Sequence, residues 1–175
     1  MYSLIQNRGD KVKNFCIITN IPKDKDLQIT KLIIQWLEGH KKQVFLQDEL
    51  ANLLGLSGSE QTFSLVEEVA EQVDCAIILG GDGTILGSAR ALALHNVPII
   101  GVNLGTLGFL AEIEKENVIQ VLENILQEKY IIENRMMLSV EIVRDGQVFS
   151  SDVALNDAVI TRGGTSRIVK LRSFI

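Results

Sequence analysis

The chain has 175 residues, of which 46% are hydrophobic and 22% are charged, and its formal net charge is -5. These values are typical of an ordinary globular protein that buries a core, and the acidic balance argues against a broad nucleic-acid-binding face. No run reaches the ~18 apolar residues that a membrane span needs. Residues 1–10 lack the apolar stretch of a signal peptide, so we expect a cytoplasmic protein.

Apolar runs alternate with helical patterns in the first part of the chain. Strands are predicted at residues 14–19, 43–46, 74–79 and 98–102, and helices at 24–38, 61–72 and 85–95. The segment 51–60 contains glycine and serine, which favours a loop. Strands that alternate with helices predict an α/β fold with a doubly wound, parallel, Rossmann-like sheet, which we place at residues 1–110.

The pattern changes in residues 111–175. A helix is predicted at residues 117–127, and residues 138–143 alternate with the period of a strand. Asp145-Gly146 is typical of a two-residue hairpin turn, and a strand is predicted to return at 148–160. We therefore expect a β-rich antiparallel domain here. Residues 167–175 are strand-like and end without a turn, which indicates that the domain is incomplete.

The two cysteines, Cys16 and Cys75, lie inside predicted strands, and we expect both to be buried, reduced thiols. The only histidines are His40 and His95. Two distant cysteines without histidine partners do not form a zinc site, so no residues are assigned as metal ligands.

The strongest candidate site is Gly80-Gly81-Asp82-Gly83-Thr84, between a buried strand and a helix. In a parallel sheet, ligands bind at such strand ends. The glycines let backbone N–H groups approach a phosphate, and the helix N-terminus adds a partial positive charge. A carboxylate in this position can take a proton from a hydroxyl or hold a metal ion. The structural alternative is a tight turn in which Asp82 caps the helix.

This motif differs from a Walker A loop, which would end in Gly-Lys-Ser/Thr, and from the dehydrogenase fingerprint G-x-G-x-x-G. It resembles the GGDGT motif shared by NAD kinases and the diacylglycerol and sphingosine kinases. That resemblance implies a kinase and leaves the substrate open.

Residues 101–110, GVNLGTLGFL, are similar to a segment of NAD kinases, whereas the lipid kinases tend to carry a loop like LGTGNDFA. The loop presents backbone amides and one aromatic ring, and Phe109 is a candidate to stack on an adenine face. From composition alone, Phe109 would be an ordinary core residue. The resemblance favours contact with a ligand.

A third segment, residues 154–160 (ALNDAVI), places two polar residues among apolar ones. Asn156 and Asp157 suit the two hydroxyls of a ribose, although a solvated edge or bulge is the alternative. The segment resembles the second NAD kinase motif, which implies that Asn156 and Asp157 contact the nucleotide ribose. Arg167 falls where the family often has a further nucleotide contact.

Across residues 79–167, the resemblance implies an NAD kinase, which uses ATP with Mg²⁺ or another divalent metal to phosphorylate the 2′-hydroxyl of NAD and make NADP. It also implies a homo-oligomer, dimer or tetramer. Gly87 stands where the family often has a basic residue, and the later family segment DG…TPTGSTAY, which completes the NAD pocket, is missing. A lipid kinase and a catalytically incomplete nucleotide-binding fragment are the alternatives.

Overall fold

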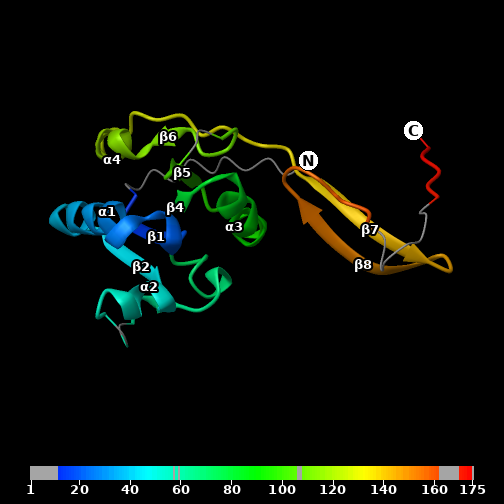
Figure 1. The fold of residues 1–175 in the computed structure, drawn as a ribbon, viewed down its shortest axis with the longest axis horizontal. Helices are drawn as coiled ribbons and strands as arrows, with labels where there is room; N and C mark the ends of the chain where they lie inside the picture. The colour runs from blue at the N-terminus through cyan, green and yellow to red at the C-terminus, as the bar shows by residue number, and fades with distance from the viewer. Residues whose placement is uncertain (1–11, 57, 59, 106–107, 162–169, 175) are drawn as a thin grey trace. The chain divides into compact units, whose positions relative to one another are not determined.

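Six parallel strands form one sheet in the N-terminal part of the chain (Figure 1). The computed structural model describes residues 12–56, 58, 60–105, 108–161 and 170–174. The strands are β1 (Asn14–Thr19), β2 (Gln43–Gln47), β3 (Thr62–Phe63), β4 (Cys75–Gly80), β5 (Ile99–Asn103) and β6 (Ile113–Glu114). Their order across the sheet is β3-β2-β1-β4-β5-β6, which is a doubly wound arrangement. The predicted fold class is therefore confirmed.

The central strands are apolar throughout because both faces of the sheet are covered. Phe15 and Ile17 of β1 point into a core with helices α1 (Gln28–Gly39) and α4 (Val118–Leu126). Cys16 and Ile18 point into the opposite core, with α3 (Asp82–Leu94). Figure 1 shows α1 and α4 on one side of the sheet and α3 on the other. The buried strand predicted at residues 74–79 is β4, all of whose residues are buried.

Two predictions in the segment after β2 differ from the structure. A short helix, α2 (Asp48–Leu53), takes up the start of the predicted loop 51–60. The prediction of a helix at residues 61–72 was wrong. Strand β3 pairs in parallel with Leu46 and Gln47 of β2, and it is followed by the single 3-10 turn Val66–Glu68. Pairing with the sheet edge overrides the local helical pattern there.

Helix α1 begins later than the predicted residue 24, because Asp26 and Leu27 have positive φ angles of 55° and 54°, which do not fit a right-handed helix. The Asp24 carboxylate is buried and accepts hydrogen bonds from the backbone N–H groups of Ile29 and Thr30, at 3.1 and 2.8 Å. Two 3-10 turns, Ile21–Lys23 and Lys25–Leu27, precede the helix. Within the described residues, none of the helices combines the length and apolar character needed to cross a membrane.

The structure divides after Arg135, into the units Met1–Arg135 and Met136–Ile175, and the predicted boundary near residue 110 lies earlier. The reason is α4, whose residues Val118, Leu122 and Ile125 are buried in the same core as α1. Strand β6 also pairs with β5, so both elements belong with the sheet.

The second unit contains a hairpin of β7 (Leu138–Arg144) and β8 (Gln147–Ala154). Asp145 and Gly146 form the predicted turn with positive φ angles of 51° and 77°, as a tight hairpin turn requires. Strand β8 ends at Ala154, short of the predicted residue 160.

Candidate nucleotide-binding site

The carboxyl ends of β1 and β4 lie side by side at the point where the strand order reverses, since β1 is followed by β2 on one side and β4 by β5 on the other. In doubly wound sheets, ligands bind in the crevice at this point. A pocket of about 710 Å³ lies there, lined by segments 18–23 and 81–84 together with Gln47 and Glu49. Small-molecule pockets typically measure about 300–1,000 Å³, so this one can hold a nucleotide.

The turn from β4 into α3 forms one wall of the pocket. Gly80 ends the strand, and a Cβ on Gly80 would stand 2.7 Å from Cβ of Thr84, which is too close. The carbonyl oxygen of Gly81 accepts hydrogen bonds from the N–H groups of Thr84 and Ile85, at 2.9 and 3.2 Å. The first N–H groups of a helix have no partner within the helix, so this turn can present donors to an anion.

Asp82 is the first residue of α3, and its side chain makes no capping bond to that helix. The structure therefore differs from the alternative in which Asp82 caps the helix. Its Oδ2 instead accepts a hydrogen bond from the N–H of Phe109 at 2.9 Å. Its Oδ1 accepts two more, from the N–H groups of Leu110 at 3.0 Å and Ala111 at 3.2 Å. The carboxylate therefore joins the first motif, residues 80–84, to the second motif, residues 101–110.

These bonds act on the charge of Asp82. The N–H of Phe109, followed by that of Leu110, holds the pKa of the carboxyl below its ordinary value. Desolvation opposes them, and the N–H of Ala111 adds the smallest lowering effect. Hydrogen bonds to the charged form stabilise it. Asp82 is therefore an anion near neutral pH and a weaker base than an ordinary carboxylate.

The second motif is bound to the first through its backbone as well. The N–H of Leu104 donates to the carbonyl oxygen of Gly80 at 3.0 Å, and buried Asn103 accepts a bond from the N–H of Gly105 at 2.7 Å. The Phe109 ring is 90% exposed, so it is not the core residue that composition favoured. Its proposed contact with an adenine stays a prediction.

The turn after β1, residues 20–23, forms another wall of the pocket. The sequence motifs did not predict that these residues belong to the site. The N–H of Asn20 donates to the carbonyl oxygen of Leu79 at 2.8 Å, and its side-chain amide donates to Oγ1 of Thr84 at 3.4 Å. Lys23 follows in the same turn and reaches Gly81. A polar residue directly after a buried strand was the available signal, but only the strand order places this turn beside Gly80.

Hydrogen bonds behind the turn hold it in place. Thr30 donates its hydroxyl proton to Asp24 at 2.6 Å. The 2.9 Å contact between the hydroxyls of Thr19 and Thr30 must then have Thr19 as the donor. This chain of bonds, buried between β1 and α1, fixes the backbone on both sides of residues 20–23.

The third motif lies in the second unit, Met136–Ile175. Asn156 and Asp157 follow the end of β8, both are exposed, and Nδ2 of Asn156 donates to Oδ2 of Asp157 at 2.9 Å. Arg167 lies outside the described residues. The ribose contacts of these three residues remain predictions.

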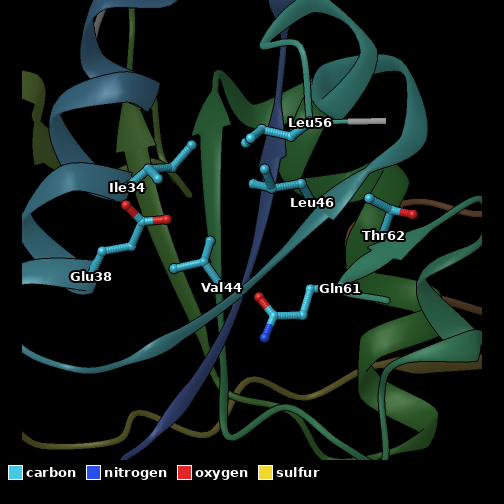
Figure 2. Close-up of a pocket in the computed structure, with 7 residues that line it drawn as sticks. All are labelled: Ile34, Glu38, Val44, Leu46, Leu56, Gln61 and Thr62. Carbon is cyan, nitrogen blue, oxygen red and sulfur yellow. The ribbon is translucent and has the colours of Figure 1, made fainter. Parts of the chain in front are cut away.

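A second, smaller pocket of about 120 Å³ lies between α1 and the β2–β3 edge of the sheet (Figure 2). Four of its seven lining residues are aliphatic, namely Ile34, Val44, Leu46 and Leu56, and Figure 2 shows Glu38 and Gln61 beside them. This volume is below the usual range for a nucleotide-sized ligand, so the pocket at β1 and β4 is the candidate site.

The described residues contain no group of three or more His, Cys, Asp or Glu side chains placed to hold a metal ion. The Asp82 oxygens are already engaged by backbone N–H groups.

Comparison with known proteins identifies relatives of this chain. The family model for the ATP-NAD kinase N-terminal domain matches residues 15–130. An NAD kinase of Lachnoclostridium phytofermentans is 44% identical over 94% of this chain and 56% of its own length. One of Ruminiclostridium cellulolyticum is 39% identical over the same shares.

The chain thus spans about 56% of the length of these curated relatives. In structure it is similar to a yeast NADH kinase in complex with NADH, with a TM-score of 0.66 and 22% identity over 83% of this chain and 46% of that one. This likeness supports the fold, and the family model and the relatives extend over the sheet and both motifs of the candidate site. The chain belongs to the NAD kinase family.

Proposed function

We propose that this chain carries the phosphoryl-transfer site of an NAD kinase, which uses ATP to phosphorylate the adenosine 2′-hydroxyl of NAD and yields NADP. The observation that carries the proposal is the Asp82 carboxylate, which joins the Gly80–Thr84 turn to residues 109–111 at the pocket between β1 and β4. Family membership supports the same activity, and the relatives lend no support to the lipid-kinase alternative.

In the proposed mechanism, the Gly80–Thr84 turn binds the phosphates of ATP, as donors at a helix N-terminus suit an anion. The 2′-hydroxyl oxygen attacks the γ-phosphorus, the bond from that phosphorus to the β,γ-bridging oxygen breaks, and ADP leaves. Phosphoryl transfer depends mostly on positioning and charge neutralisation. Mg²⁺ or another divalent ion bound to the phosphates would supply part of that neutralisation.

Asp82 has one acceptor position left for the substrate hydroxyl. A carboxylate has about four lone-pair sites. Two on Oδ1 are used by Leu110 and Ala111, and one on Oδ2 by Phe109. We propose that the remaining site on Oδ2 accepts the 2′-hydroxyl hydrogen bond and orients the nucleophile. Because the pKa of Asp82 is lowered, it takes the proton late, after most of the P–O bond change.

The remaining contacts are proposed from the resemblance. The β-rich unit would be the start of an NAD-binding domain, with Asn156, Asp157 and Arg167 at the ribose and Phe109 against an adenine. The exposed apolar residues of the hairpin, such as Ile142 and Phe149, favour association, so we propose a homo-oligomer. We also propose that the protein is cytoplasmic. Light scattering coupled to gel filtration tests the oligomeric state.

The activity is tested by incubating the 175-residue chain with NAD and Mg-ATP and measuring NADP by enzymatic cycling. NADP formation that Asp82→Asn abolishes supports the kinase. Binding of both nucleotides without NADP formation favours the alternative of a catalytically incomplete nucleotide-binding fragment. A chain that binds neither nucleotide would overturn the proposed function.

A further inference from the structure

We propose that Lys23 binds the phosphates of the donor nucleotide and supplies the positive charge of the pocket. This inference rests on the proposed function, and it assigns a role to a residue outside all three sequence motifs. Lys23 lines the pocket together with Gly81, Asp82 and Gly83. Its Nζ lies 3.4 Å from the position that a Cβ on Gly81 would occupy, so the ammonium group stands over the start of α3.

The charges of the pocket favour such a cation. Among the described lining residues, Glu49 and Asp82 are acidic and Lys23 is the basic one. A nucleoside triphosphate carries several negative charges, and two carboxylates by themselves would repel it. An ammonium group next to the N–H donors of the Gly81 turn offsets that repulsion at the place where those donors can bind phosphate.

The backbone of Lys23 is fixed while its side chain stays accessible. Its N–H donates to the carbonyl oxygen of Asn20 at 2.9 Å, and Asp24, the next residue, is buried in the capping bonds of α1. Lys23 itself is exposed, and no acidic partner for it occurs in the described part of the chain. An anchored residue with an unpaired ammonium group is suited to a ligand that comes and goes.

Lys25 provides a matched control. It lies in the next turn, has the same charge and is also exposed, but it does not line the pocket. Lys23→Met and Lys25→Met therefore change the net charge of the chain equally. Lys23→Arg keeps the charge at the pocket.

The experiment measures binding of ATP, ADP and AMP to the 175-residue chain and to these three variants by isothermal titration calorimetry. We expect Lys23→Met to weaken ATP binding about tenfold, as the loss of one charge-assisted hydrogen bond does. The effect should fall from ATP to ADP to AMP. Lys25→Met should leave all three affinities unchanged, and Lys23→Arg should restore most of the ATP affinity.

Equal weakening by Lys23→Met and Lys25→Met would overturn the proposal, because the effect would then come from net charge alone. ATP binding that is unchanged in Lys23→Met would also overturn it and leave the proposed function standing. If the wild-type chain binds none of the three nucleotides, the donor site and the role of Lys23 fail together. A Lys23→Met effect of the same size for all three would exclude contact with the β- and γ-phosphates and would overturn the proposal.

Discussion

Asp82 and Gly108 lie so close together that a Cβ on Gly108 would stand 2.6 Å from Cγ of Asp82. The carboxylate occupies the space that any other residue at 108 would fill, and from there it reaches the N–H groups of residues 109–111. The carboxylate of Asp82 in the first motif can thus take this position only because residue 108 in the second motif is a glycine. The two motifs are parts of one structure although they are distant in sequence.

Gly108→Ala should destabilise the chain by about 1–3 kcal/mol, the usual cost of forcing an extra carbon into a filled space. Gly105→Ala is the control, because a Cβ there meets nothing within 4 Å. Urea unfolding of both variants checks this. In an Asp82→Ala background the cost of Gly108→Ala should fall; equal costs in both backgrounds would show that Asp82 is not the obstructing group.

The charge of Asp82 should make stability depend on pH. Its pKa in the folded chain lies below the ordinary 3.8, so its contribution is present above that value and is lost as pH falls through the lowered pKa. Asp82→Asn offers one acceptor oxygen to the three N–H donors and should be less stable at neutral pH. The wild-type protein should thus exceed Asp82→Asn in free energy of unfolding near pH 7 and near pH 5, and the difference should shrink towards pH 3.

Urea unfolding at these three pH values gives the comparison. A difference that stays constant from about pH 7 to about pH 3 would contradict a lowered pKa for Asp82, since protonation would then have removed no interaction.

Two glycines of the first motif should have different roles: Gly80 a structural one and Gly83 one in ligand binding. Gly80→Ala should destabilise the chain by about 1–3 kcal/mol, because a Cβ there would collide with the Thr84 side chain. Gly83 meets nothing within 4 Å, so Gly83→Ala should leave stability unchanged or raise it by up to about 1 kcal/mol within the helix. If phosphates approach this turn, the added methyl group of Gly83→Ala should weaken ATP binding.

Thermal unfolding with and without ATP tests both variants. The stabilisation by ATP should be smaller for Gly83→Ala than for the wild-type chain. A Gly83→Ala variant that unfolds at a lower temperature without ligand would show that the turn is more crowded than the structure indicates.

The two cysteines should be unreactive in the folded chain, as their buried positions confirm the expectation from the sequence. Burial raises the pKa of Cys16 to about 12 and raises that of Cys75 as well, so little reactive thiolate is present. A disulfide reagent that releases a coloured thiolate should label the native chain at least about a hundredfold more slowly than the chain in urea.

Gly87→Cys places a thiol at an exposed position on α3 and serves as the control. This variant should release one equivalent at once. Rapid labelling of the chain without that substitution would mean that one of the sheet faces opens readily.

The amino-acid sequence by itself determined those features that depend on neighbours along the chain. The apolar runs predict β1 and β4, the spacing of apolar residues predicts α4, and Asp145-Gly146 predicts the hairpin turn. The motif at Gly80–Thr84 was recognisable as a strand-to-helix turn at a ligand-binding position, because glycines and a helix N-terminus act locally.

Tertiary structure alone decided which distant segments meet. The edge strands β3 and β6 are two residues long, too short for a periodic pattern, and they form only because a neighbouring strand offers partners. The order β3-β2-β1-β4-β5-β6 brings the turn of Lys23 against Gly81, and the fold of residues 108–111 gives Asp82 its three donors. Such contacts depend on packing between residues far apart in the chain, and no local spacing encodes them.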